Sequence, residues 1–367
     1  MIAAPRAIFR YARRVRARSL SAERLHRQLI SQQPFARPVE VVRWFGAIQA
    51  QDYPASLWAL GLRTAGARQA DVEAAIADGS IIRMHGFRGT WQHVARDDAR
   101  WMLGLVGERL VAGSARRMRA IGLAPKTLVR AVDCMARALD GGGQLTRHEL
   151  AGALTRARIG SDGGRLMHIL WYAELHGLLC SGAPRGKHQT FALLDERVPP
   201  SRALGREPSL TRLAERYFRS RGPATERDFA WWTGLGMGDV REAIALAHPA
   251  LERVELDGRV YWNAAGAAGS TRDGAELLPA FDECLIGYQD RAAFVEAAHV
   301  RRINAGGGLL RPIVLLGGRA VGTWRRTIVK GAMAIVPEPF ARLAAREREA
   351  LAAAIDRYAT FVAQAAR

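Results

Sequence analysis

The chain has 367 residues and a formal net charge of +19, because 54 Lys and Arg outweigh 35 Asp and Glu. This length exceeds what one ordinary hydrophobic core holds, so we expect roughly two to four domains. The basic excess is typical of a protein that binds a polyanion, and nucleic acid is the first candidate. An Arg-rich proteome would supply part of the same excess, so charge alone does not establish DNA binding.

Cysteine content and hydropathy exclude several classes of protein. Cys134, Cys180 and Cys284 are odd in number and far apart, which excludes a disulfide framework and a Cys-x-x-Cys zinc site. No apolar stretch approaches the roughly 20 residues that span a bilayer, and the N-terminus lacks the apolar segment of a secretory signal. We therefore expect a cytoplasmic, nucleoid-associated protein without a membrane partner.

The first domain is expected over residues 21–115, after a basic N-terminal arm at residues 1–20. The arm carries six arginines and no acid, which fits either a real extension or an overextended start codon. Apolar periodicity predicts four helices and then a hairpin, with helices at 22–31, 39–48, 55–62 and 69–78 and strands at 81–83 and 90–94. The hairpin turn carries Arg88. The run Gln49-Ala50-Gln51 is expected at the end of the second helix, and Asp52 is expected to cap the third.

Two further segments repeat this order of helices followed by a hairpin. The second, residues 120–200, has predicted helices at 125–139, 147–158 and 164–176 and strands at 178–181 and 190–194. A glycine-punctuated basic tip with Arg185, Lys187 and His188 joins these strands. The third, residues 205–265, has predicted helices at 209–221, 226–232 and 237–247 and a hairpin at 254–262 with an Asp-Gly turn. Capping boxes at Thr146 and Thr225 open the middle helix of each segment.

Residues 270–367 change character to strands separated by glycine turns, at 312–316 and 320–326, and end in a predicted helix at 339–363. The expected fold is therefore mainly α with β: tandem winged-helix (helix-turn-helix) domains plus a C-terminal β-rich domain. A winged helix offers one helix to the major groove and a basic hairpin to the DNA backbone. Winged helices also serve as protein-interaction modules, and that alternative stays open.

The usual entry points to metal and hydrolase chemistry are missing from the sequence. Residues 182–187 superficially resemble a P-loop, but the glycine spacing is one residue short and His188 stands where Ser or Thr must bind magnesium. No Gly-x-Ser-x-Gly, His-Glu-x-x-His or dense His/Cys/Asp cluster appears. We expect neither a metal site nor a cofactor.

Gln49 and Gln51 are the most informative candidates, because two carboxamides follow an otherwise apolar run. An amide donates and accepts at once, so such a pair can hold a water or a substrate oxygen without adding a charge. A polar helix end that bonds only to backbone is the plainer interpretation of the same pair. His93, beside Trp91, is a further candidate for ligand contact, although a packed histidine is more common.

Five segments together resemble the winged-helix DNA glycosylases of the AlkZ/YcaQ type, and the resemblance runs from about residue 20 to 360. These segments are residues 41–54, Arg88-Gly89-Thr90-Trp91, 225–232, 277–283 and Gly322-Thr323-Trp324-Arg325-Arg326. The family excises N7-alkylated purines and unhooks interstrand crosslinks, and Gln-x-Gln is its catalytic signature. The resemblance implies catalytic roles for Gln49 and Gln51.

Two departures from the family pattern occur in this chain. Gln92 and His93 follow Trp91 where relatives commonly have His directly after the aromatic residue, and Cys284 replaces an aromatic residue. Fold and DNA binding therefore transfer from the family more readily than the choice of lesion does.

The implied enzyme is a monomeric, monofunctional glycosylase that acts on double-stranded DNA carrying alkylated or crosslinked bases. Alkylation at N7 makes the purine a good leaving group, so neutral amides suffice to steady an oxocarbenium-like sugar and deliver water. The expected DNA contacts come from five side chains on the hairpins: Arg88, His93, Arg185, Lys187 and His188. A non-catalytic winged-helix regulator and an RNA-binding factor are the rival interpretations.

Overall fold

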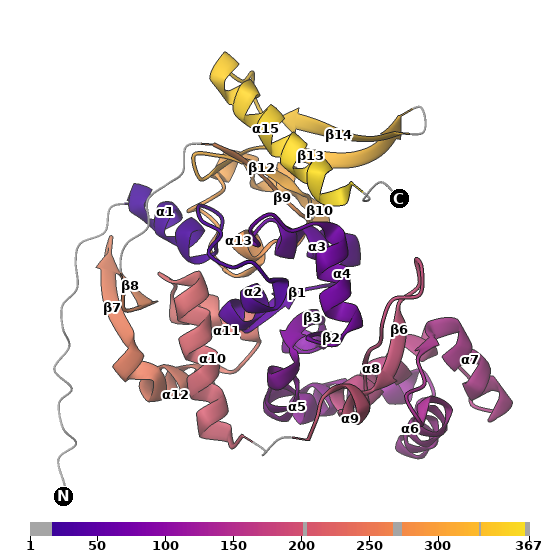
Figure 1. Ribbon diagram of the computed structural model, residues 1–367. Helices are drawn as coiled ribbons and strands as arrows, with labels where there is room; N and C mark the ends of the chain where they lie inside the picture. Colours follow the sequence, from indigo (N-terminus) through magenta and orange to yellow (C-terminus); the bar gives the residue numbers. More distant parts are fainter. Residues whose placement is uncertain (1–16, 201–203, 267–273, 330–331, 364–367) are drawn as a thin grey trace, which may run out of the picture. The chain divides into compact units, whose positions relative to one another are not determined.

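The structure is a computed structural model that describes residues 17–200, 204–266, 274–329 and 332–363 (Figure 1). Most of the expected basic arm, residues 1–16, lies outside the described residues. The chain divides into two compact units, Met1–Gln32 with Leu210–Ile355 and Gln33–Ser209 with Asp356–Arg367. Within the described residues, no helix is long and apolar enough to cross a membrane.

The unit built on residues 33–209 is mainly helical and holds two three-stranded antiparallel sheets, β1-β3-β2 and β4-β6-β5. Its elements in chain order are α2 (Pro38–Phe45), β1 (Ala47–Gln49), α3 (Tyr53–Gly61), α4 (Gln69–Ala77), β2 (Ile81–His85), η1 (Phe87–Gly89), β3 (Trp91–Ala95), η2 (Arg96–Asp98), α5 (Ala99–Ala120), α6 (Pro125–Leu139), β4 (Leu145–Thr146), α7 (Arg147–Arg156), α8 (Arg165–Leu175), β5 (Leu179–Ser181), β6 (Thr190–Leu193) and α9 (Leu194–Arg197).

The expected helix 39–48 is wrong at its end, and this changes the setting of the Gln pair. Helix α2 stops at Phe45 because Gly46 adopts φ 80°, a conformation that suits glycine, and its N–H donates to Val42 O. The chain then runs straight into β1, whose residues pair with β3. Gln49 therefore lies at the end of β1, an edge strand of the β1-β3-β2 sheet, rather than at a helix end.

Periodicity predicted most of the other helices of this unit well, although not α5. Helix α6 has the predicted bounds, and its buried Leu128, Ala131, Met135 and Leu139 recur every three or four residues on one face. The capping box at Thr146 is confirmed, since the Thr146 side chain accepts from Glu149 N and the Glu149 carboxylate accepts from Thr146 N. The 22-residue helix α5 was not predicted.

The other unit combines helices with a four-stranded antiparallel sheet of order β14-β13-β12-β9. Its elements are α1 (Ala17–Arg27), α10 (Arg206–Arg221), α11 (Glu226–Thr233), α12 (Met237–Ala247), η3 (His248–Ala250), β7 (Leu251–Leu256), β8 (Arg259–Ala264), β9 (Ala275–Leu278), α13 (Glu283–Ile286), η4 (Ala297–His299), α14 (Val300–Ile303), β10 (Asn304–Gly306), β11 (Leu309–Leu310), β12 (Ile313–Leu316), β13 (Arg319–Val329) and β14 (Ala332–Pro339). Helix α15 (Ala345–Val362) passes from this unit to the other.

The expected terminal helix begins later than predicted, because Pro339 ends β14 opposite Gly322. Strand β14 lies at the edge of its sheet, where prolines are tolerated since no ladder hydrogen bond is lost (Figure 1). The helix starts at Ala345 instead.

A buried ion pair lies in the core of this unit. It includes Glu283, and Cys284 is buried next to it in the chain. Glu283 accepts from Arg221 Nη2 at 2.7 Å and from Trp232 Nε1 at 3.0 Å, and Arg221 and Glu283 are both buried. Cys284 is fully buried, and its Sγ lies 3.2 Å from Gln28 Oε1. The departure at Cys284 is therefore a matter of core packing within this unit.

Candidate functional site

The Gln pair lies at the C-terminal end of β1, and β3 holds both of its side chains. Gln49 is opposite Gln92 in the strand register, is only 6% exposed, and accepts from Gln92 Nε2 at 3.3 Å. Gln51 is exposed, and its Oε1 accepts from Trp91 N at 3.3 Å. The two amides therefore straddle Ala50, one inside the protein and one at the surface.

Arg83 on β2 binds the backbone between the two glutamines. Its Nε and Nη2 donate to Ala50 O at 3.1 and 3.0 Å, and its guanidinium lies 3.9 Å from the centre of the Trp91 ring. The side chain is buried, and burial lowers the pKa of Arg83 to about 10. It remains charged at neutral pH.

His93 is fully buried beside this network, so its ring does not reach the surface where DNA would lie. Its Nε2 lies 2.9 Å from the Ser56 hydroxyl, which itself donates to Tyr53 O. The hydroxyl therefore accepts from His93, which places the ring proton on Nε2. Burial, followed by the charge of Arg83, lowers the pKa of His93 to about 3. The ring is neutral at physiological pH.

A second buried pair, His85 and Glu174, packs against Trp91 through the His85 ring. His85 Nδ1 bonds Glu174 on α8, and the His85 and Trp91 rings are 3.9 Å apart. Burial raises the pKa of Glu174 above its ordinary value. Three buried polar atoms in this cluster have no hydrogen-bond partner among the described residues: Gln92 Oε1, His93 Nδ1 and Glu174 Oε1. Such orphan atoms are typical of places where ordered water or a ligand completes the bonding.

The basic hairpin tip lies at the surface, as expected. Arg185 and His188 exchange backbone hydrogen bonds across it, and Gly186 allows the tight turn with φ 58°. Arg185, Lys187 and His188 are exposed, but Arg185 also bonds Glu149 at 2.8 Å. Arg88 lies on η1 with φ 58° and is half-buried.

Sequence reasoning singled out the two glutamines but missed the groups that hold them. Arg83 interrupts the apolar strand Ile81–His85, and Glu174 interrupts the apolar face of α8. A charged residue within a buried element is itself a signal of function, because a buried charge is costly unless it is compensated. Gln92 was noted only as a departure from the family pattern.

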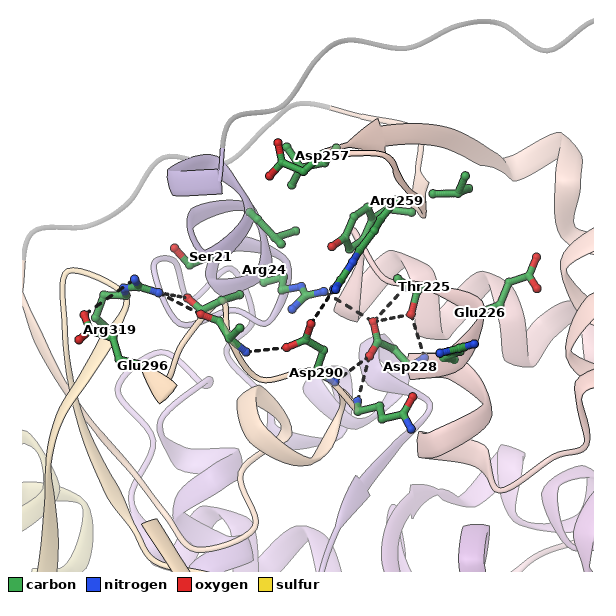
Figure 2. A pocket seen from close by; sticks show the side chains of 18 of the residues that line it. Ser21, Arg24, Thr225, Glu226, Asp228, Asp257, Arg259, Asp290, Glu296 and Arg319 are labelled. Atoms are coloured by element: carbon green, nitrogen blue, oxygen red, sulfur yellow. Dashed lines mark hydrogen bonds and ion pairs between the residues drawn. The ribbon is translucent and has the colours of Figure 1, made fainter. Parts of the chain in front are cut away.

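A large hollow lies in the other unit and has a volume of about 1520 Å³ (Figure 2). Its arginines face acids: Arg24 lies 3.7 Å from Asp228, and Arg259 lies 2.8 Å from Asp290. The lining therefore mixes paired charges with the exposed side chain of Arg227. In the part of the chain that the structure describes, no group of three or more His, Cys, Asp or Glu could hold a metal ion.

Comparisons with known proteins agree on one family. Residues 42–361 match the model of a family described as DNA glycosylase AlkZ-like. An interstrand DNA cross-link repair glycosylase of Streptomyces sahachiroi is 26% identical over 341 residues, which cover 88% of this chain and 90% of that protein. The solved structure of Streptomyces sahachiroi DNA glycosylase AlkZ superposes with a TM-score of 0.79 at 22% identity, covering 95% of this chain and 97% of the other. The mixed α/β fold with small antiparallel sheets is thus shared with that structure.

Proposed function

Because the chain belongs to the AlkZ-like DNA glycosylases, we propose that it hydrolyses the N-glycosidic bond of N7-alkylated purines in duplex DNA. We extend the proposal to the unhooking of interstrand crosslinks, since one relative is named for that repair. The arrangement of Gln49 and Gln51 beside β3 is the observation that carries it.

The two amides suit a reaction whose leaving group departs easily. Alkylation at N7 gives the purine a positive charge, so departure of the base needs little help, and the enzyme steadies an oxocarbenium-like sugar and supplies water. Each Gln Oε1 accepts a bond from β3, and an amide oxygen can in general accept two. Neutral His93 adds no positive charge beside the developing cation.

The same site favours a monofunctional enzyme. A lyase step proceeds through attack of an amine on the sugar, for which lysine is the usual side chain. The sequence holds three lysines, Lys126, Lys187 and Lys330, and none belongs to the strands that carry the Gln pair. The expected product is therefore an abasic site in an uncut strand.

In the proposed enzyme, the protein is a monomer of tandem winged-helix domains, and the surfaces of their hairpins bind DNA. Helices α6, α7 and α8 with the β5–β6 hairpin follow the order of helices and wing that such a domain requires. Exposed Arg185, Lys187 and His188 supply phosphate contacts, joined by Arg88. Buried His93 acts beneath them, holding Ser56 at the start of α3.

The proposal is tested by incubating the purified protein, in the presence of EDTA, with alkylated duplex DNA and identifying released bases by mass spectrometry. Free N7-alkylguanine above the spontaneous background supports it. Binding of the duplex with no released base would favour a non-catalytic regulator instead.

A further inference from the structure

We propose that Arg83 is a positioning residue for the Gln pair, fixing the carbonyl of Ala50 so that Gln49 and Gln51 hold one geometry. The inference rests on the proposed glycosylase function. It concerns a residue that no motif in the sequence singled out.

The Arg83 side chain binds the motif, and backbone hydrogen bonds hold both Arg83 and the motif in place. Nε and Nη2 both donate to Ala50 O, at 3.1 and 3.0 Å, so a planar fork grips a single carbonyl. Above the motif, Ala50 N donates to Trp91 O at 2.8 Å, which ties the same residue to β3. The Arg83 backbone N–H donates to Ser181 Oγ at 2.9 Å, which anchors β2 to β5.

Arg83 also supports the residue that orients Gln51. The guanidinium lies over the Trp91 ring at 3.9 Å from its centre, and the ring of His85, which bonds Glu174, also contacts Trp91. Trp91 N donates to Gln51 Oε1. One cation thus fixes both the carbonyl between the glutamines and the aromatic residue whose amide holds the second glutamine.

A buried charge with no carboxylate in direct contact needs an explanation. Arg83 is 7% exposed, and among the described residues no carboxylate lies within 4.0 Å of it, although the more distant Glu174 favours its charge. Removing a charge from water is costly, and a carbonyl with two aromatic faces compensates it only in part. Stability alone would favour an apolar residue in this strand, as at Ile81, Ile82 and Met84. Positioning of the Gln pair supplies the reason for the charge.

Lysine could not replace arginine here. An ammonium is a point charge that would give Ala50 O one bond and would lose the planar stacking on Trp91. The proposal therefore predicts that the conservative variant fails, which separates geometry from charge.

The test compares Arg83→Ala and Arg83→Lys with the matched control Arg96→Ala. Arg96 makes the same kind of fork at the other end of the hairpin, donating from Nε to Gly79 O at 2.9 Å and from Nη2 to Asp78 O at 2.8 Å. Single-turnover base release is measured at saturating protein on duplex with one N7-methylguanine, together with Kd and the urea unfolding midpoint.

We expect both Arg83 variants to lower the single-turnover rate constant by about tenfold or more, with Kd changed less than about threefold. Arg96→Ala is expected to keep the wild-type rate constant. Wild-type rates in Arg83→Ala, or full activity in Arg83→Lys, would overturn the proposal. If Arg83→Ala does not fold, the single-turnover rate constant of Arg83→Lys alone tests the proposal. If the wild-type protein releases no base, the glycosylase function itself is refuted.

Discussion

Gln49 and Gln51 differ in exposure, and under the proposed function this difference would give them separate tasks. Gln49 is buried with its amide fixed by Gln92, so it is placed to hold a water in one orientation. Gln51 is exposed at the end of the motif, where a sugar or an extruded base can reach it. Neither amide carries a charge that DNA phosphates would bind, which keeps catalysis apart from affinity.

Gln49→Ala and Gln51→Ala are each expected to lower the single-turnover rate of base release by about tenfold or more while duplex binding survives. Rate constants at saturating protein and Kd by anisotropy check this. Gln69→Ala serves as a control, because Gln69 lies on α4 and its amide donates to Glu73 rather than to the motif. Wild-type rates in both motif variants would remove the glutamines from catalysis.

His93 predicts a specific dependence of stability on pH. Its folded-state pKa of about 3 lies below the ordinary value of 6.5, so the unfolded chain binds more protons between these values. The contribution of His93 to stability is therefore complete above about pH 6.5 and falls as pH drops toward 3, by roughly 1 kcal/mol per pH unit.

His93→Gln removes this proton uptake and should flatten the fall in stability. The urea unfolding midpoints of wild type and variant are compared at pH 7 and pH 5. Glu174 and other groups titrate in both proteins, so their effects on stability cancel in the difference between wild type and variant. A parallel fall in the two proteins would show that His93 is not neutral and buried in solution.

At the scale of elements, the tip of the β5–β6 hairpin exposes the basic side chains of Arg185 and Lys187 to solvent. Changing Arg185 and Lys187 to Ala removes up to two phosphate contacts, so the slope of log Kd against log salt should shrink by up to about two units. The two single variants, Arg185→Ala and Lys187→Ala, show how much of the change in slope each side chain contributes. Lys187→Ala should account for more of it, because Arg185 already bonds Glu149 and Gln144 O.

Single-turnover rates at saturating protein are expected to change little in these hairpin variants. Equal salt slopes for wild type and double variant would remove the tip from the DNA-binding surface and leave its charge as a feature of composition.

Local signals determined most of the helices but not the turn that presents the Gln pair. Helices α6 and α12 have the predicted bounds, because apolar periodicity and their boundary residues act within one segment. Helix α2 ends early at Phe45, since pairing of β1 with β3, 43 or more residues away in the sequence, competes with helix continuation. The long α5 was missed for want of a clear apolar stripe.

The candidate site divides in the same way. Gln49 and Gln51 could be named from a motif, and Asp52 was correctly expected to cap α3, where its Oδ1 accepts from Ala55 N at 3.1 Å. Arg83 and Glu174 could not, because their partners are brought together only by the folded sheet and α8. Glu174 lies 89 residues beyond His85 in the chain.

At the scale of the whole molecule, the net charge of +19 predicts how undamaged DNA is bound. Affinity should be electrostatic, nearly independent of sequence, and should fall steeply as salt rises. Titrations of several unrelated duplexes over a salt series check this. A flat salt response, or tight binding of one sequence only, would favour a regulator.

The most direct test of the account uses an end-labelled duplex with a single N7-methylguanine, incubated with the protein in EDTA and divided before mild alkali treatment. We predict an intact labelled strand before alkali, a single cut at the lesion after alkali, and no cut in the matched guanine duplex or the protein-free control. Folded protein that binds this duplex yet leaves the lesion strand no more alkali-labile than the protein-free control would contradict the assignment of glycosylase chemistry to this chain.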